Sequence, residues 1–206
     1  MSSLTKSIYP LFESVCILEG VIQNAKYHSQ RFLRSYQKIY FEVPNFNLFD
    51  GIKIPSEYCR GKVKLRISYN QNERKHSFQP YTTKKVNLLK VVIDNTIDYE
   101  LKFEDRSPLE HLYSQRMDCD DILIVKNGWL TDSYYANICF WNGSKWYTPT
   151  TYLLNGTKRI QLLKSEEIEE AHIELKDLEH FQGFQLINAM LDFDPNTYLP
   201  IENVIL

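Results

Sequence analysis

Short apolar runs separated by Asn-Gly dipeptides constrain the fold of the second half of the chain more than any other feature. Asn127-Gly128 and Asn142-Gly143 each stand between two runs rich in β-branched and aromatic side chains. Asn-Gly favours the positive φ angles of the tightest hairpin turns, so each pair of runs is expected to form neighbouring antiparallel strands. The expected strands are residues 121–126, 129–130, 136–141 and 145–148.

The rest of the chain predicts a mixture of helices and further strands. Apolar side chains at helical spacing predict a helix over residues 25–40. A second helix is expected from about 107 to 115, with Ser107 as its N-cap and Pro108 at its first position, and a third at 157–163. Strands are expected at residues 11–18, 21–22, 62–69, 76–81 and 86–93, the last of them apolar enough to be buried on both faces.

The predicted fold class is α+β, with antiparallel pieces dominating. The polar run Asp94-Asn95-Thr96 is the best candidate for a boundary between two subdomains. These are expected to be a smaller N-terminal α+β subdomain at residues 1–95 and a C-terminal subdomain at residues 96–206.

Composition excludes several classes of protein. The 206 residues carry 24 Lys and Arg against 26 Asp and Glu, so the net charge of −2 argues against non-specific binding to nucleic acid. The longest apolar stretches have about five residues, whereas a transmembrane helix needs about 20. The opening Met1–Lys6 does not lead into the apolar region of a secretory signal, and the four cysteines show no Cys-x-x-Cys spacing. We predict a soluble, cytoplasmic protein with no membrane partner.

Taken singly, the reactive side chains do not identify a function. The five histidines lack metal-ligand spacing, and His28 is expected to be a core histidine with a hydrogen-bond partner. The basic side chains of the helix at 25–40 are typical of a solvated face. Asp118, Asp120 and Asp121 fit a polar loop before a buried strand better than a metal site.

Several short motifs gain meaning from their order along the chain. Phe12-Glu13-Ser14 and then Gly20 precede His28-Ser29-Gln30-Arg31-Phe32, and Lys102-Phe103-Glu104-Asp105-Arg106 comes just before the expected second helix. The later motifs are Thr131-Asp132, Asn137-Ile138, Leu153-Leu154-Asn155-Gly156-Thr157-Lys158-Arg159 and Ile187-Asn188-Ala189.

This ordered set resembles the motifs of the class IV aminotransferases. That family carries Phe-Glu-Thr, Gly and His-x-x-Arg-Leu, then Lys-x-x-Asn-Arg, Thr/Ser-Glu, Asn-Leu/Ile, Leu-x-Gly-Ile-x-Arg and Thr-Asn-Ser/Ala. The resemblance implies a pyridoxal-phosphate enzyme of fold type IV (the D-amino-acid aminotransferase-like fold), with the cofactor bound in the cleft between two subdomains. The shortness of the chain, the residues around Lys102 and the segment Trp146-Tyr147-Thr148-Pro149 look closest to the 4-amino-4-deoxychorismate lyase-like members.

The resemblance also implies roles for individual residues. Lys102 matches the lysine that forms a Schiff base with the cofactor, and Asp132 stands where the family has the glutamate that faces the pyridine nitrogen. Arg31 matches an arginine that binds the cofactor phosphate. The remaining expected cofactor-binding residues are Asn137, Thr157, Lys158, Asn188 and Ala189.

Three departures from the family pattern are visible, of which the first two bear on the substrate and the third on the turn at Asn188-Ala189. No Tyr-Gly-x-Gly segment precedes Phe12, Cys16 occupies the position of a substrate-binding arginine, and extra residues follow Asn188 before Pro200. The expected reaction is pyruvate elimination from 4-amino-4-deoxychorismate to give 4-aminobenzoate, a step of folate biosynthesis. The alternatives are a class IV amino-acid transaminase and a cofactor-binding homologue that has lost catalysis. The resemblance further implies a small-molecule substrate and a homodimer, and the slightly negative charge argues against a nucleic-acid partner.

Overall fold

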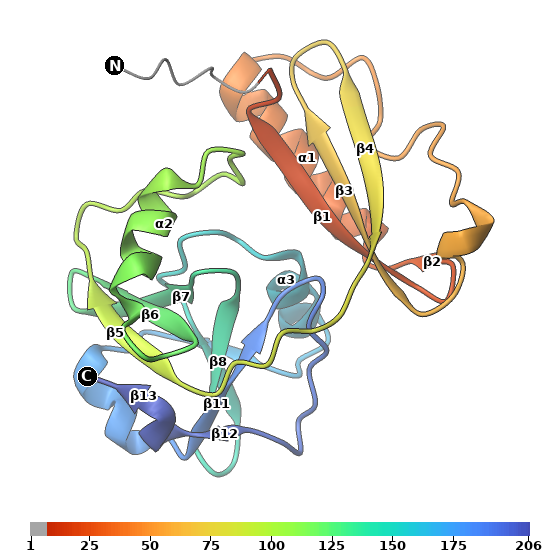
Figure 1. Ribbon diagram of the computed structural model, residues 1–206. Coiled ribbons are helices and arrows are strands. Elements are labelled where there is room, and N and C mark those ends of the chain that lie inside the picture. The colour runs from red at the N-terminus through yellow and green to blue at the C-terminus, as the bar shows by residue number, and fades with distance from the viewer. Residues whose placement is uncertain (1–7) are drawn as a thin grey trace. The chain divides into compact units, whose positions relative to one another are not determined.

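The computed structural model describes residues 8–206 and divides them into two compact units, each described here by itself (Figure 1). The first unit contains residues 8–82 together with residues 101–106, and the second contains residues 83–100 and 107–206. The first unit thus ends at residue 82, whereas the predicted boundary is at residue 95, and the chain returns to that unit at residues 101–106. Met1–Lys6, on which the expectation about a signal segment rests, lie outside the described residues.

An antiparallel four-stranded sheet with the order β2-β1-β3-β4 forms the base of the first unit. Its strands are β1 (Leu11–Leu18), β2 (Val21–Ile22), β3 (Lys62–Tyr69) and β4 (Arg74–Pro80). The central strand β1 pairs with β3 along its whole length. The predicted strand at 76–81 is therefore confirmed with a start two residues earlier, and those at 11–18, 21–22 and 62–69 are confirmed within their predicted bounds.

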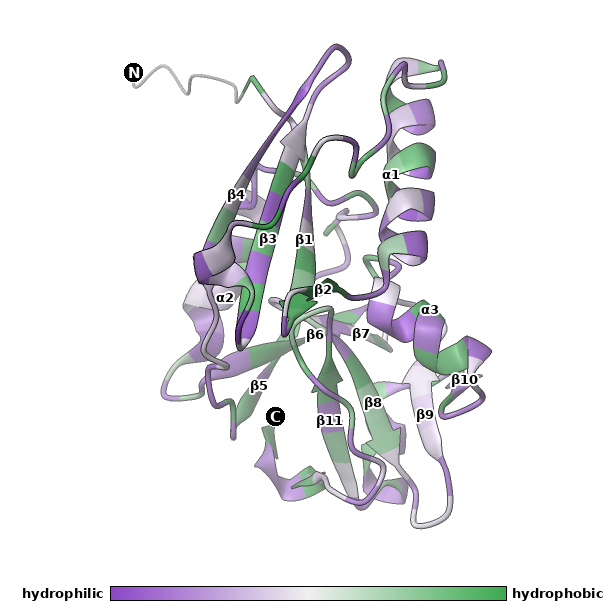
Figure 2. Cartoon of the chain, turned by 90° about the vertical axis from the view of Figure 1, so that its right-hand side faces the viewer, coloured by the Kyte–Doolittle hydropathy of each residue, from purple (hydrophilic) through white to green (hydrophobic). Residues whose placement is uncertain are grey.

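Helix α1 (Ala25–Tyr40) has the predicted bounds and provides the aromatic core of the first unit. Phe32 and Tyr36, one helical turn apart, are each 1% exposed. The ring of Phe32 lies 4.9 Å from that of Tyr69 on β3, edge to face, which is a favourable arrangement of two aromatic rings. Figure 2 shows the resulting alternation of hydrophobic and hydrophilic residues along α1 and β3.

Residues 101–106 belong to the first unit because they hydrogen-bond to the start of β1. The backbone N–H of Phe12 donates to the carbonyl of Lys102 at 3.1 Å, and that of Glu104 donates to Pro10 at 2.8 Å. Leu11 and Phe103 form an isolated antiparallel bridge. These backbone bonds join positions about 90 residues apart, a distance at which local sequence patterns carry no pairing information. They also place Lys102 beside β1.

The second unit is built on two sheets. One has the order β13-β5-β6-β7 and the other the order β10-β9-β8-β11-β12. The first sheet consists of β5 (Leu89–Ile93), β6 (Asp121–Lys126), β7 (Trp129–Ser133) and β13 (Val204–Ile205), and the second of β8 (Asn137–Trp141), β9 (Trp146–Pro149), β10 (Glu169–Ala171), β11 (Gly183–Ile187) and β12 (Leu199–Pro200). Buried residues of both sheets, among them Leu123 and Phe140, form one hydrophobic cluster.

The two Asn-Gly turns lie where they were expected. Asn127 and Gly128 have φ values of 54° and 83° between β6 and β7, and Asn142-Gly143 connects β8 to β9. The predicted strand at 86–93 is shorter in the structure, and Ile93 at its end is 63% exposed, so β5 is not buried on both faces. This prediction was wrong because β5 pairs with β6 along its whole length, to Ile93, but the side chain of Ile93 is not covered on its own face of the sheet.

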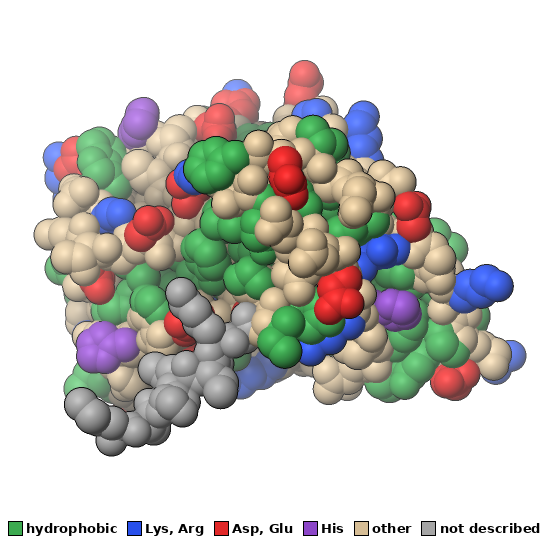
Figure 3. Space-filling view, turned by 90° about the horizontal axis from the view of Figure 1, so that it is seen from above, with side chains coloured by type: hydrophobic (Ala, Val, Ile, Leu, Met, Phe, Trp, Pro, Cys, Tyr) green, Lys and Arg blue, Asp and Glu red, His purple; other side chains and the backbone are tan. Residues whose placement is uncertain are grey.

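Two helices complete the second unit. Helix α2 (Ser107–Tyr113) is followed by a 3₁₀ turn at residues 114–116, and α3 (Thr157–Lys164) begins directly after Gly156. No helix within residues 8–206 is long and apolar enough to cross a membrane. Figure 3 shows acidic and basic side chains interspersed over the displayed face, not separated by sign.

Candidate active site

A fully buried glutamate organises the charged residues of the first unit. Glu13 on β1 is 0% exposed and accepts hydrogen bonds from Arg31 through both carboxylate oxygens, from Nε at 2.8 Å and from Nη2 at 2.5 Å. His28, one turn before Arg31 on α1, lies with its Nδ1 2.6 Å from Glu13 Oε2. The helical spacing of three residues puts both side chains on the face of α1 that meets β1. His28 is thus a buried core histidine with a partner, as predicted.

The charges within this cluster follow from its burial. Burial alone raises the pKa of Glu13, but the charge and hydrogen bonds of Arg31, assisted by His28, outweigh it and lower that pKa to about 2. Burial lowers the pKa of His28, although Glu13 opposes this shift. His28 is therefore neutral near pH 7. Because an ionised carboxylate only accepts hydrogen bonds, Nδ1 of His28 must carry the proton and donate it to Glu13.

Lys102 has the chemistry of a nucleophilic amine. Its Nζ lies 4.8 Å from the centre of the Phe12 ring, and within residues 8–206 no carboxylate lies at ion-pair distance from it. Burial, followed by the positive charge of Arg31, lowers the pKa of Lys102 to about 7, although Glu13 acts in the opposite direction. A large share of this amine is consequently unprotonated near neutral pH, which is the form that attacks a carbonyl carbon.

This lowered pKa predicts how the amine reacts with pH. The reaction of Lys102 with a trace of isotopically labelled acetic anhydride should reach half its maximal rate near pH 7. An ordinary lysine, with a pKa near 10.4, should reach it more than three pH units higher. Mass spectrometry of the peptide that contains Lys102 measures this rate, with peptides of exposed lysines as internal references. A rate that rises only above pH 9 would contradict the burial of the charge.

Asp132 is the corresponding acid of the second unit. It lies on β7, is 5% exposed, and accepts hydrogen bonds from Asn137 Nδ2 at 2.7 Å and from the backbone N–H groups of Leu153 at 3.0 Å and Leu154 at 2.9 Å. Burial raises the pKa of Asp132 to about 6, although these three donors oppose the shift. The carboxyl group is thus held in one orientation and remains largely ionised at pH 7.

Asn137 connects Asp132 to the loop before α3. Its Nδ2 also donates to the carbonyl of Leu154 at 2.9 Å. A Cβ atom at Gly156 would lie 1.9 Å from Asn137 Oδ1, so only glycine allows this close approach. Thr157, the first residue of α3, is 2% exposed, and Lys158 Nζ donates to Gln161 at 3.0 Å. Asp132, Asn137 and the start of α3 therefore form one connected group.

The predicted turn at Asn188-Ala189 lies near this group. Asn188 Oδ1 accepts hydrogen bonds from the backbone N–H groups of Met190 at 2.8 Å and Leu191 at 3.0 Å, which closes the turn after β11. Its Nδ2 donates to the carbonyl of Tyr135 at 3.3 Å, in the loop between Asp132 and Asn137. The extra residues before Pro200 thus leave the turn next to the Asp132 loop.

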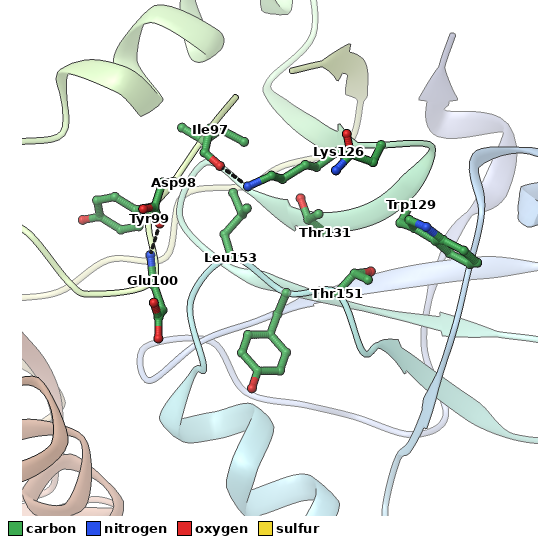
Figure 4. A pocket seen from close by; sticks show the side chains of 11 residues that line it. Ile97, Asp98, Tyr99, Glu100, Lys126, Trp129, Thr131, Thr151 and Leu153 are labelled. Carbon is green, nitrogen blue, oxygen red and sulfur yellow. Dashed lines mark hydrogen bonds between the residues drawn. The ribbon is translucent and has the colours of Figure 1, made fainter. Parts of the chain in front are cut away.

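A pocket of about 310 Å³ opens within the second unit (Figure 4). None of the predicted site residues lines it. Its lining does include Thr131, which precedes Asp132 in the chain, and Leu153, whose backbone N–H donates to Asp132. On one side Lys126 Nζ donates to the carbonyl of Ile97 at 2.6 Å. This pocket is therefore distinct from the group of residues predicted to bind the cofactor.

The structure thus groups the predicted residues within each unit. In the first unit, Arg31 binds Glu13, whose negative charge acts on the pKa of Lys102. In the second unit, hydrogen bonds and adjacent backbone link four of the predicted residues: Asp132, Asn137, Thr157 and Asn188. Sequence reasoning assigned no role to Glu13, although it stands in the Phe-Glu-Ser motif. Its signal was a charged residue in a mostly apolar strand, which calls for a buried partner.

Comparison with known proteins identifies a matching family and similar proteins. Residues 106–195 match the class IV amino-transferase family, a range that includes Asp132 and Asn188 and begins after Lys102. A Haemophilus influenzae protein of uncharacterised function is 40% identical over 185 residues, covering 89% of this chain and 98% of that protein. The crystal structure of a candidate 4-amino-4-deoxychorismate lyase from Haemophilus somnus is 32% identical with a TM-score of 0.79, covering 89% of this chain and 97% of that one.

A more distant structure shows the same fold. The branched-chain amino acid aminotransferase of Escherichia coli is 14% identical with a TM-score of 0.69, and the match covers 95% of this chain and 76% of that enzyme. The predicted α+β fold of type IV is confirmed by these similarities. From the matched family, the relatives and the fold together, the chain belongs to the class IV aminotransferase family, whose members are pyridoxal-phosphate-dependent enzymes.

Proposed function

We propose that this chain binds pyridoxal 5′-phosphate and eliminates pyruvate from 4-amino-4-deoxychorismate to give 4-aminobenzoate. The observation that carries the proposal is Lys102, an amine with a pKa of about 7 and no carboxylate partner within residues 8–206. Such an amine fits the aldehyde of the cofactor, since a neutral amine is the attacking form. The name of the Haemophilus somnus relative supports this choice of reaction.

The other residues fit the remaining parts of the cofactor. The carboxylate of Asp132 would face the ring nitrogen and keep it protonated, since an opposite charge at short range favours the charged form. The guanidinium of Arg31 would bind the phosphate, joined by the backbone at Thr157 and Lys158 and by the turn at Asn188 and Ala189. Asn137 would orient the carboxylate of Asp132, to which its Nδ2 donates a hydrogen bond at 2.7 Å.

The bound cofactor would supply an electron-withdrawing ring that stabilises negative charge on the carbon bearing the substrate amine. Lys102 Nζ would then accept the proton from that carbon. The bond between the substrate ring and the enolpyruvyl oxygen breaks with the electron pair on oxygen, and the ring becomes aromatic. Protonated Lys102 would return the proton to the methylene carbon of the released enol, which becomes pyruvate. Atoms and charges balance without any further reactant.

Aromatic side chains beside Asp132 support a cyclic substrate. Tyr134 and Tyr135 occupy the loop between Asp132 and Asn137, with ring centres 4.1 Å apart, and Tyr113 of α2 stacks on Tyr134 at 4.3 Å. Tyr135 is 60% exposed and offers a flat surface to a planar ring. A surface of this kind suits a cyclohexadiene ring better than the short side chain of an ordinary amino acid.

The direct test adds 4-amino-4-deoxychorismate to purified protein saturated with pyridoxal phosphate. We expect equal amounts of 4-aminobenzoate, measured by its fluorescence, and of pyruvate, measured by a coupled dehydrogenase. Exchange of amino groups between an amino donor and a keto acid, without pyruvate release, would identify a transaminase instead. A bound cofactor without either reaction would identify a homologue that has lost catalysis. Light scattering of the same sample should give a homodimer of twice 24.4 kDa.

A substitution at Asp132 tests its proposed role opposite the ring nitrogen. Asp132→Asn should lower turnover by roughly 10²- to 10⁴-fold, because a neutral amide cannot stabilise the protonated ring, and should shift the visible absorbance of the bound cofactor. Asp118→Asn, the same change at an exposed aspartate outside the proposed contacts, is the matched control and should retain both properties. Full turnover with an unchanged spectrum in Asp132→Asn would make Asp132 a residue of the turn only.

A further inference from the structure

The proposed chemistry uses Arg31 but leaves the buried charge beside it unexplained. Glu13 has no exposed surface and could not touch a substrate from solvent. Burying an ionised carboxylate is costly unless it is paired and hydrogen-bonded. A hydrophobic residue at this position of β1 would pack without that cost. A function for the charge itself therefore has to be found in what it does to its neighbours.

The contacts of Glu13 fix the orientation of the Arg31 side chain. Both carboxylate oxygens accept from one edge of the guanidinium, through Nε at 2.8 Å and Nη2 at 2.5 Å. A pair of parallel hydrogen bonds on a planar group defines the plane of that group as well as its position. Arg31 binds through this edge, so the N–H groups of Nη1 lie on the opposite side of the guanidinium from Glu13.

His28 in turn fixes Glu13. Its Nδ1 donates to Oε2 at 2.6 Å, the oxygen that also accepts from Arg31 Nη2. His28 is 0% exposed, so its ring cannot move away without opening the core. The three side chains therefore form a chain of contacts from His28 through Glu13 to Arg31, in which each member has one position.

We propose that Glu13 is a positioning residue that holds the plane of Arg31 for binding the phosphate group of the ligand, with His28 holding Glu13. This inference rests on the proposed function, in which Arg31 binds phosphate. The buried charge of Glu13 would thus increase the affinity for the phosphate group. This role is separate from the attachment of the ligand aldehyde to Lys102.

The variant Glu13→Gln tests this role with little change of shape. Glutamine replaces one carboxylate oxygen by an NH₂ group. In either orientation of the amide, that group faces an N–H of Arg31, and in one orientation it also faces Nδ1–H of His28. One donor must then turn away from another, so the guanidinium loses its fixed plane.

The experiment compares two ligands that differ only in the phosphate. Dissociation constants of pyridoxal 5′-phosphate and of pyridoxal are measured on the cofactor-free protein by fluorescence titration. Both ligands have the aldehyde that reacts with Lys102, although in free pyridoxal the 5′-hydroxyl closes on it as a hemiacetal. That difference is the same for every variant, so the change of the ratio from wild type to variant isolates the contribution of the phosphate. In Glu13→Gln we expect the preference for the phosphorylated ligand to fall by roughly 10- to 100-fold, the size of a lost charge-assisted hydrogen bond.

Two controls separate positioning from general damage to the fold. Val15→Ala removes a buried side chain two residues along the same face of β1, without touching Arg31, and should weaken folding while leaving the ratio unchanged. If Glu13→Gln does not fold, as judged by circular dichroism, His28→Ala takes its place. That variant removes one of the three hydrogen bonds to Glu13 and should lower the ratio by a smaller factor.

The outcomes for the two proposals are distinct. If the wild-type protein binds both ligands equally or binds neither, the proposed function fails. If the wild type prefers the phosphorylated ligand and a folded Glu13→Gln variant keeps the whole preference, the positioning role of Glu13 is overturned. A fall of the ratio in Val15→Ala equal to that in Glu13→Gln overturns it as well.

Discussion

Replacing Lys102 with alanine is expected to reduce turnover by at least roughly 10²- to 10⁴-fold, the contribution of a positioned acid or base. The same variant should no longer be labelled when borohydride is added to the cofactor-saturated protein, because no amine remains to hold the pyridoxyl group. The fold should persist, since the backbone carbonyl of residue 102, not its side chain, accepts the hydrogen bond from Phe12. Peptide mapping by mass spectrometry measures the label, and circular dichroism measures the fold.

Lys64→Ala is the matched control for this experiment. Lys64 lies on β3 in the same unit, partly exposed, and belongs to none of the proposed contacts with the cofactor. That variant should retain both turnover and the label at Lys102. A pyridoxyl group found on another lysine of the wild-type protein, or undiminished labelling of Lys102→Ala, would show that the amine has been wrongly assigned.

Replacing Glu13 with alanine is expected to destabilise the protein by about 3–5 kcal/mol, the cost of leaving one partner of a buried ion pair alone. The residue left behind is Arg31, which is only 6% exposed and cannot recover its hydration without local opening. The loss should be visible as a lower midpoint of urea unfolding followed by circular dichroism. Glu104→Ala offers a matched comparison, because Glu104 also pairs with an arginine, Arg66, but with both side chains about one-third exposed. Its cost should stay below about 1 kcal/mol.

The dependence of this loss on pH follows from the pKa of Glu13. That pKa falls from 4.5, its ordinary value, to about 2 in the folded protein. A lowered pKa stabilises the folded state above the ordinary value and ceases to do so as the pH falls towards 2. At 1.36 kcal/mol for each pH unit, the contribution is about 3 kcal/mol at pH 6 and about 1 kcal/mol at pH 3. The stability difference between wild type and Glu13→Ala should therefore narrow on acidification. A difference that stays constant would show that Glu13 stabilises by packing alone.

Elements defined by neighbouring residues could be predicted from the sequence. The helix at 25–40 was predicted with its observed bounds, because the apolar side chains that face the core recur at the helical period. The Asn-Gly turn at 127–128 was predicted from the φ values that its residues tolerate. By contrast, the strands β10 to β13 were not predicted. They are two to five residues long, have no Asn-Gly turn beside them to mark them, and owe their conformation to the strands beside them.

The candidate site divides in the same way. The amino-acid sequence by itself determined the family, through the order of motifs that include Lys102, Asp132 and Asn137. That order is a property of the linear chain and can be recognised without knowing which residues are in contact. Only the tertiary structure decided that residues 101–106 join the first unit, and that Glu13 binds Arg31 and His28 from 18 and 15 residues away. The physical reason is that burial and charge act through space. The pKa of about 7 at Lys102 depends first on burial and then on Arg31, which lies 71 positions earlier in the chain and comes near Lys102 only when β1 and α1 pack together.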